Sequence, residues 1–259
     1  MQPSFTVLLC VVRPPDLIDL AIASVQAQTR EDFELFVVCD GAPEATVDAA
    51  CDMAARDPRI RVFPFEKGER HGELHRDAVL REARGRFVCH VADDDLWLPH
   101  HLDGMAALLE GADFGHSFTL FLSPKGKPSL RLHDLADPAI RARLQTERWN
   151  YFGPTCAGYR LSAYRRLPVG WAPAPPEIWS DLHMWRKFLA LPDIRCATRF
   201  DVSTISFPAV SRRNMDLALR RAEMSTIAAM QPSALAAIMN AAAASWPTVE
   251  LPRISSLED

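Results

Sequence analysis

Three consecutive carboxylates, Asp93, Asp94 and Asp95, directly follow the apolar run 86–91. Carboxylates at such short spacing repel one another unless a cation neutralises them. Mg²⁺ or Mn²⁺, held by one or two carboxylates and completed by phosphate oxygens and water, suits this pattern. An acidic turn that only caps the next helix also explains these residues, so the motif alone leaves both interpretations open.

Two other polar positions fall at the ends of expected strands. Arg13 follows the first apolar run, and Asp40-Gly41 follows the second. The carboxyl ends of parallel strands meet at one edge of a sheet, where ligands bind. The carboxylate of Asp40 can accept a hydrogen bond from the imide of a pyrimidine base there. A plain Asp-Gly turn is the other interpretation.

The elements that must position these residues alternate along the first half of the chain. We expect strands at 5–12, 33–39, 60–65, 86–91 and 113–122. Four helices are expected between these strands. The first is capped by Asp16, the next two cover 44–56 and 72–83, and the last begins at Pro99. This β-α alternation is typical of a parallel sheet flanked by helices. The run 5–12 is apolar without alternation, which predicts a strand buried on both faces.

The second half of the chain is less regular. A hairpin-type turn is expected at 123–128 and a long loop, often functional, at 168–176. Ser180 is expected to cap a helix that turns Leu182, Trp185 and Leu189 toward the core. Two Ala-rich helices are expected between 214 and 245, broken at Pro232.

Composition excludes several classes of protein. The 259 residues carry a net charge of −4, which argues against a protein that coats nucleic acid. No apolar run is long enough to cross a bilayer, and the first residues lack the pattern of a secretory signal. The six scattered cysteines form no CxxC pair, which favours a reducing, cytoplasmic location.

Several segments together resemble the glycosyltransferases of family 2. The resemblance begins at Thr6-Val-Leu-Leu and runs through Asp32-Phe-Glu-Leu-Phe-Val-Val-Cys-Asp-Gly41. It continues at His75-Arg-Asp-Ala78, Asp93-Asp-Asp-Leu-Trp-Leu-Pro99 and Ser180-Asp-Leu-His-Met-Trp185, and it covers most of 5–190. It implies an α/β GT-A fold, with a mostly parallel Rossmann-like sheet and C-terminal helices. It also implies inverting transfer of a sugar from a nucleoside-diphosphate sugar to a hydroxyl acceptor, with Mn²⁺ or Mg²⁺ as cofactor.

The resemblance assigns the nucleotide to the ends of the first strands. It implies that the backbone of Cys10, Val11, Val12 and Arg13 contacts the nucleotide. It also implies that Asp40 contacts the base and that Arg76 lies near the nucleotide. Because an aspartate accepts from a pyrimidine imide, UDP or dTDP is favoured over GDP.

The carboxylate motif departs from the family pattern, because Ala92 stands where its first aspartate belongs. The resemblance then implies that Asp93 contacts the ribose and Asp94 binds the metal, with Asp95 a second ligand or a neighbour of the site. The family's later histidine ligand is missing. Arg212 and Arg213 replace it as a diphosphate clamp or form a solvated pair. His71 and His75 have metal-pair spacing but no third ligand nearby in sequence.

The resemblance makes Asp181 the catalytic base that deprotonates the acceptor hydroxyl. Its place in the first helical turn favours the ionised form, and a purely dipole-complementing role is the alternative. Glu177 is the second candidate base. Trp171 or Trp179 is expected to stack on an acceptor sugar, whereas Trp185 is expected to pack in the core.

The resemblance also implies how the chain is divided, which partners it binds and which other functions remain open. Residues 1–122 would bind the nucleotide sugar, 123–210 would bind the acceptor and catalyse, and 211–259 would form a helical extension. That extension suits core packing first, then a subunit or a membrane surface. The partners are a nucleotide-sugar donor and a saccharide or other hydroxyl acceptor. An inactive nucleotide-sugar-binding module is one alternative. A nucleotidyltransferase is another, although 10–15 lack its glycine- and lysine-rich loop.

Overall fold

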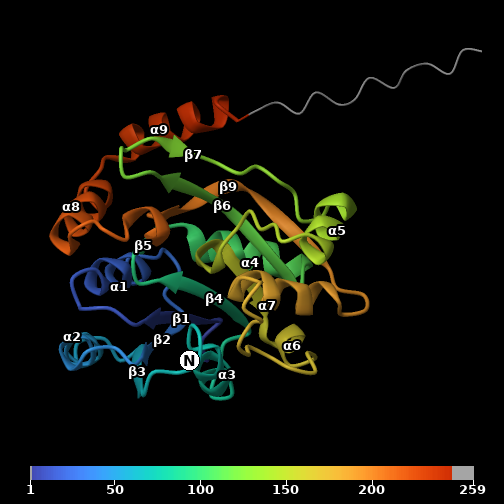
Figure 1. Cartoon of the computed structure of the whole chain (residues 1–259), viewed down its shortest axis with the longest axis horizontal. Helices are drawn as coiled ribbons and strands as arrows, with labels where there is room; N and C mark the ends of the chain where they lie inside the picture. The colour runs from blue at the N-terminus through green and yellow to red at the C-terminus, as the bar shows by residue number, and fades with distance from the viewer. Residues whose placement is uncertain (1, 247–259) are drawn as a thin grey trace, which may run out of the picture.

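The structure, a computed structural model, describes residues 2–246 and is built on one mixed sheet (Figure 1). The strand order is β3-β2-β1-β4-β8-β6-β9-β5, with β7 paired to β6. The strands are β1 (Phe5–Val11), β2 (Phe33–Asp40), β3 (Ile60–Phe65), β4 (Phe87–Ala92), β5 (Asp95–Trp97), β6 (Phe114–Leu122), β7 (Pro128–Ser129), β8 (Ala157–Arg160) and β9 (Cys196–Ser206).

The four strands β1 to β4 are parallel, as predicted. Leu8 of β1 packs into the core on one face of the sheet, and Val7 and Leu9 pack into the core on the other. The unbroken apolar run of β1 is therefore buried on both faces, which is what its composition predicts.

The rest of the sheet departs from the predicted β-α alternation. The strand expected at 113–122 is present as β6, but β8 lies between it and β4 and is antiparallel to both. The loop expected after β4 also contains a strand, because β5 pairs with β9 and sets Asp95 opposite Ser206. The chain returns twice from its second half to extend the sheet, so the sheet is mixed.

Helices cover both faces and one end of the sheet (Figure 1). They are α1 (Ile18–Gln26), α2 (Glu44–Ala54), α3 (Glu73–Leu80), α4 (His101–Gly111), α5 (Pro138–Thr146), α6 (Leu161–Tyr164), α7 (Ser180–Leu189), α8 (Leu217–Ala228) and α9 (Pro232–Ala244). Helices α1, α2 and α4 share one core, and α3, α5, α6 and α7 share the other. Helices α8 and α9 close a third apolar cluster over β5, β6 and β9.

Two predicted helix caps are wrong. Helix α1 begins at Ile18 with Leu17 as N-cap, and helix α7 begins at Ser180 with Trp179 as N-cap. The side chains of Asp16 and Ser180 therefore cap neither helix. The backbone carbonyl of Asp16 instead accepts from Arg221, and the buried Ser180 hydroxyl has no hydrogen-bond partner among the described residues.

The C-terminal prediction holds for the described residues. Helices α8 and α9 are separate and α9 starts at Pro232, although 247–259 lie outside the described part. The hairpin turn is also present, since the Ser123 amide donates to Lys127. Within 2–246 no single helix has the length and hydropathy to cross a membrane, and α8 and α9 meet those criteria only as a pair bent by 104°. The predicted boundaries at 122 and 210 stay a prediction.

Candidate functional site

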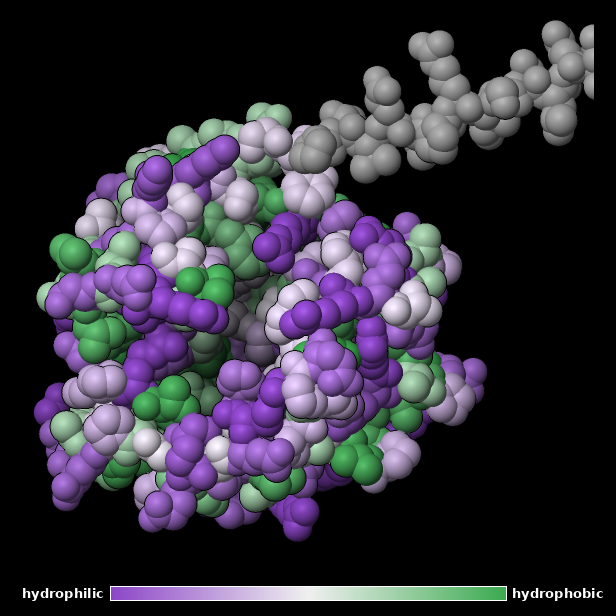
Figure 2. All heavy atoms as spheres, in the orientation of Figure 1, coloured by the Kyte–Doolittle hydropathy of each residue, from purple (hydrophilic) through white to green (hydrophobic). Residues whose placement is uncertain are grey.

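A cavity of about 330 Å³ with several charged side chains in its wall lies at the carboxyl ends of β1 and β4, and we call it the donor cavity after the nucleotide-sugar donor that the family resemblance predicts there. Figure 2 shows this face of the molecule hollowed at its centre, with mostly hydrophilic residues around the opening. The residues that line the cavity come from both strands and the segments that follow them, from the loop after β3, from helix α3 and from the turn before β8. They are Leu8, Cys10, Val12, Arg13, Lys67, Arg70, His71, Arg76, His90, Val91, Ala92, Asp93, Asp94 and Pro154.

A second cavity of about 650 Å³ adjoins the first, and we call it the acceptor cavity. Asp181, Trp179, Asn150 and Arg131 are among its lining residues. Four residues line both cavities and so mark their junction: Arg70, His71, Arg76 and Pro154. The arrangement gives one continuous space with a cationic junction between two chambers.

The end of β1 divides between the core and the donor cavity. Cys10, Val12 and Arg13 line the cavity, whereas the side chain of Val11 is buried in the core. The Arg76 Nε donates to Cys10 Sγ at 3.1 Å. Burial raises the pKa of the Cys10 thiol, so this side chain is a neutral acceptor for Arg76.

Asp40 lies at the end of β2, with its carboxylate already engaged. Lys67 Nζ is 2.7 Å from Oδ2, and the Gly68 amide donates to Oδ1 at 2.6 Å. Lys67 is the residue of this pair that lines the donor cavity. A base would therefore meet Lys67 first, and contact with Asp40 requires the ammonium to move aside.

Asp93 and Asp94 face arginines from two distant parts of the chain. Arg13 Nε is 3.1 Å from Asp93 Oδ2, and Arg13 Nη1 is 2.6 Å from Asp94 Oδ2. Arg220 Nη2, from helix α8, is 2.5 Å from the same oxygen of Asp94. Burial and the neighbouring Asp94 raise the pKa of Asp93, and Arg13 opposes this shift. The approach of Arg13 to the acidic motif is as predicted, whereas the contact between Arg220 and Asp94 was not predicted.

Asp95 is directed into the protein. Thr155 Oγ1 donates to one carboxylate oxygen at 2.5 Å, and the Phe207 amide donates to the other at 3.0 Å. Burial and the adjacent Asp94 raise the pKa of Asp95. We predicted a metal ligand or a neighbour of one at this position. The pairing of β5 with β9 turns the side chain toward structural partners instead.

The carboxylates as they stand do not fit a divalent cation. Mg²⁺ and Mn²⁺ need oxygen ligands without competing positive charge. Ala92 supplies no ligand, both oxygens of Asp95 are engaged, and one oxygen of Asp94 already meets two guanidinium groups. Within 2–246 no group of three or more His, Cys, Asp or Glu side chains is arranged to hold a metal.

Asp181 lies in the wall of the acceptor cavity at the start of α7. Asn150 Nδ2 donates to its Oδ2 at 2.8 Å, and the Leu182 amide donates to Oδ1 at 2.7 Å. Among the described residues it forms no ion pair. Burial raises the pKa of Asp181 to about 6. We predicted that the helix dipole would keep this group ionised and weaken it as a base; burial outweighs the dipole and strengthens it.

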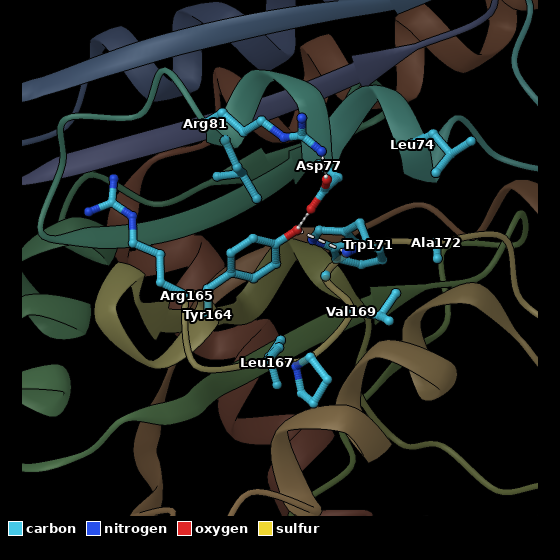
Figure 3. A pocket seen from close by; sticks show the side chains of 12 residues that line it. Leu74, Asp77, Arg81, Tyr164, Arg165, Leu167, Val169, Trp171 and Ala172 are labelled. Atoms are coloured by element: carbon cyan, nitrogen blue, oxygen red, sulfur yellow. Dashed lines mark hydrogen bonds and ion pairs between the residues drawn. The ribbon is translucent and has the colours of Figure 1, made fainter.

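Trp171 supports the cationic junction. Its ring lies under the Arg76 guanidinium, 5.0 Å from ring centre to Cζ. Trp171 also lines a neighbouring pocket of about 430 Å³. Figure 3 shows the hydrogen bonds that fix it there: the Trp171 amide donates to the Tyr164 hydroxyl, which in turn donates to Asp77. Trp171 is only 2% exposed, so almost none of its surface is available to stack on a sugar.

The remaining aromatic and basic candidates separate by exposure. Trp179 lines the acceptor cavity and is 46% exposed, with the Arg148 guanidinium 4.9 Å from its ring centre, whereas Trp185 is buried in the core as predicted. The predicted clamp residue Arg212 is buried and paired with Glu223, so its charge serves the packing of α8.

The two histidines do not form a metal pair. His75 stacks on Phe65 and bonds the Glu66 carbonyl, while His71 lines the cavities. The second candidate base, Glu177, is exposed to solvent.

Sequence reasoning missed Arg70, Lys67, Asn150 and Arg220. Arg70 lies in a loop between Gly68 and Gly72 and has a positive φ of 56°. The two glycines are a sequence signal for a tight loop at this position. Arg220 carries no local signal, because it lies 126 residues from its partner Asp94.

Comparison with known proteins places the chain beside sugar-transferring enzymes. Residues 6–167 match the model of Glycosyl transferase family 2. A succinoglycan biosynthesis protein, ExoW of Rhizobium meliloti, is 33% identical over 91 residues, 35% of this chain and 28% of ExoW. An uncharacterized glycosyltransferase of Nostoc is 27% identical over 177 residues, 62% of this chain and 52% of that protein. The matched part thus spans about a quarter to a half of these relatives.

Solved structures establish the fold. S. aureus TarS 1–349 in complex with UDP-GlcNAc superposes with a TM-score of 0.65 at 18% identity, covering 93% of this chain and 66% of that one. The mannosyltransferase PcManGT from Pyrobaculum calidifontis, in complex with GDP-Man and Mn²⁺, gives 0.54 at 18% identity, covering 96% and 82%. These are GT-A structures, so the predicted GT-A fold is confirmed.

Proposed function

Because this chain belongs to Glycosyl transferase family 2, we propose that it transfers a sugar from a nucleoside-diphosphate sugar to a hydroxyl acceptor with inversion at the anomeric carbon. The observation that carries the proposal is the pair of cavities that meet at Arg70 and Arg76, with Asp181 in the second cavity only. A donor bound across the junction would place its diphosphate among cations and its sugar toward Asp181.

In the proposed reaction the acceptor hydroxyl attacks the anomeric carbon from the side opposite the diphosphate. A carbon–oxygen bond to the acceptor forms while the bond to the leaving phosphate breaks, and its electron pair goes to the diphosphate. Asp181 takes the hydroxyl proton. A carboxylate with a pKa of about 6 suits this role, because it is ionised at neutral pH and yet more basic than an exposed one.

The residues of the donor cavity also support binding of a nucleotide. We propose that Cys10, Val12 and Arg13 contact the nucleotide and that Asp93 contacts the ribose, and the place of all four in the wall of the donor cavity supports this. UDP or dTDP stays the favoured nucleotide, with Asp40 accepting from the base once Lys67 moves. A neighbour's complex with UDP-GlcNAc supports this choice. We leave Mn²⁺ and Mg²⁺ out of the proposed reaction, because guanidinium groups engage Asp94.

The cellular setting is part of the same proposal. The six cysteines are all free thiols, which supports a reducing, cytoplasmic location. Succinoglycan biosynthesis, as named for ExoW, supports a saccharide acceptor, while another hydroxyl acceptor and peripheral contact with a membrane surface stay predictions.

A thermal-shift screen tests the proposal. A ligand that binds only the folded state raises its stability by RT ln(1 + [L]/Kd). We expect UDP, dTDP and their sugars to raise the melting temperature more than GDP, ADP or CDP. Release of UDP from UDP-sugars, measured on the same samples, separates an active transferase from a binding module. If no nucleoside diphosphate shifts the melting temperature, the proposed function is wrong.

A further inference from the structure

The cations of the donor cavity fall into two groups. Arg13 is paired with Asp93 and Asp94, and Lys67 is paired with Asp40. Arg70 and Arg76 have no carboxylate oxygen within 4.0 Å anywhere in 2–246, and they stand at the junction of the cavities. Neither junction arginine is therefore paired with a carboxylate at contact distance, and Glu73 and Asp40 act on Arg76 only from farther away.

Both junction arginines are held in place by contacts that leave their charge available. Arg76 rests on the Trp171 ring and bonds the neutral Cys10 sulfur. Arg70 Nη2 is 3.5 Å from the Ile178 carbonyl, while its buried Nε has no hydrogen-bond partner in the described chain. Its left-handed backbone, φ 56°, is costly for a residue with a side chain, and such costs concentrate at functional sites.

Asp94 is neutralised from two sides. It is 5% exposed and Arg220 is 8% exposed, so this pair is withdrawn from solvent. Arg13 approaches Asp94 from the cavity wall, whereas Arg220 reaches it from α8. The acidic motif thus presents little net negative charge to an anion in the donor cavity.

We propose that Arg70 and Arg76 neutralise the diphosphate of the donor, so that nucleotide binding needs no divalent cation. Arg220 is a positioning residue that holds Asp94 and suppresses its repulsion of the diphosphate. The proposal rests on the proposed function, since it concerns the same donor.

The chemistry of guanidinium groups supports this assignment. Two arginines carry the charge of one divalent ion, and each offers a planar set of donors that matches phosphate oxygens. Fixed positive groups at the place where charge develops on a leaving group stabilise the transition state. A divalent ion beside Asp94 would instead lie against two guanidinium groups that already share its oxygen.

Calorimetric titration of UDP into the wild-type chain tests the proposal without any substitution. We expect the Kd to agree within about twofold between buffer with EDTA and buffer with Mn²⁺. Binding that weakens tenfold or more in EDTA would overturn the cation-free assignment and leave the proposed function standing. Absence of binding by every nucleoside diphosphate, in both buffers, would overturn the proposed function itself.

Substitution of the junction arginines gives the second test. Arg76→Ala and Arg70→Ala should each weaken UDP binding in EDTA by about ten- to a hundredfold, the range for charged hydrogen bonds. Arg81→Ala is the matched control, because Arg81 lies at the end of the same helix as Arg76 and pairs only with Asp77 at the surface. If both junction variants bind UDP as tightly as the Arg81 variant, the assignment fails.

The role of Arg220 is tested by what its loss does to the metal response. Arg220→Met leaves Asp94 with one partner, so Mn²⁺ should strengthen UDP binding to this variant at least threefold. Arg220→Lys keeps a positive charge beside Asp94, so UDP binding to that variant should not respond to Mn²⁺. A purely structural role would lower stability without creating a Mn²⁺ response. Equal Kd values with and without Mn²⁺ in a folded Arg220→Met variant would overturn the positioning role.

Discussion

The end of β4 and the start of α7 both bury carboxylates, but they treat them in opposite ways. At the end of β4, each carboxylate is matched by arginines or by hydrogen-bond donors from distant segments. At the start of α7, Asp181 has one amide side chain and its neighbour's backbone amide as partners and faces an open cavity.

This difference separates structural from reactive acids. Asp95 and Asp181 each accept a hydrogen bond on both oxygens, so the number of partners does not separate them. Asp95 lines neither cavity, so it has no capacity to take a proton from a substrate bound there. A carboxylate held in orientation, without a neutralising cation and at the wall of a cavity, retains that capacity. Burial raises the pKa in both regions, so a raised pKa alone does not identify the base.

The largest effect is expected from Asp181→Asn. The amide keeps the shape of the side chain but cannot accept the hydroxyl proton, so transfer should fall by about 10²-fold or more. Donor affinity should remain within about twofold. Glu177→Gln is the matched control and should leave transfer near wild type. Loss in the Glu177 variant with transfer retained in the Asp181 variant would reverse the two assignments.

Asp95→Ala should act on stability instead. It leaves the Thr155 hydroxyl and the Phe207 amide without acceptors in a buried place, which costs about 2 kcal/mol or more in the free energy of unfolding. Urea unfolding measures the loss. The folded protein should bind UDP normally, and a specific loss of UDP binding at unchanged stability would place Asp95 in the donor site.

The pH dependence of stability should distinguish Asp181 from an exposed acid. Its pKa is raised to about 6 in the folded state, so its protonated form is favoured by folding. Wild type should therefore lose more stability than Asp181→Asn as pH rises from about 4 through 6, because the raised pKa values of Asp93 and Asp95 act in both proteins alike. The melting temperature of the variant should match wild type near pH 3.5, below the ordinary pKa of an aspartate, and exceed it by a few degrees above pH 7. A pH-independent difference would contradict the raised pKa.

The smallest effect is expected at Arg221, next to Arg220 on the same helix. Arg221 pairs with Asp19, and both side chains are 42% exposed. Exposed ion pairs contribute about 0–1 kcal/mol. Arg221→Ala should lower the free energy of unfolding by no more than this and leave UDP binding unchanged. A larger effect on binding would mean that the whole face of α8, and not Arg220 alone, supports the donor cavity.

The sequence predicts the parts of the molecule whose signals are local. Strands β1 and β2 show as continuous apolar runs, and the acidic motif follows β4 as expected. The four-residue strand β8 and the three-residue β5 are too short for a periodic signal, so the antiparallel half was not predicted. Burial of Asp181 also depends on packing that no local pattern reports.

The partners of the acidic motif lie far away along the chain. Thr155 and Phe207 are 60 and 112 residues from Asp95, so their donation to it depends on tertiary pairing. Arg220 belongs to a helix that we expected to serve packing, yet it reaches Asp94. Residue types alone therefore suggested a metal where the folded chain places guanidinium groups.

The most direct test of the account is the pH dependence of sugar transfer in a single turnover with UDP-sugar and acceptor. With Asp181 as the base, the rate should rise with pH and reach half its maximum near pH 6, where this carboxyl loses its proton. The residual rate of Asp181→Asn should lack that rise. A wild-type rate that is flat between pH 5 and 8, or a rise that persists in Asp181→Asn, would contradict the assignment of Asp181 as the base.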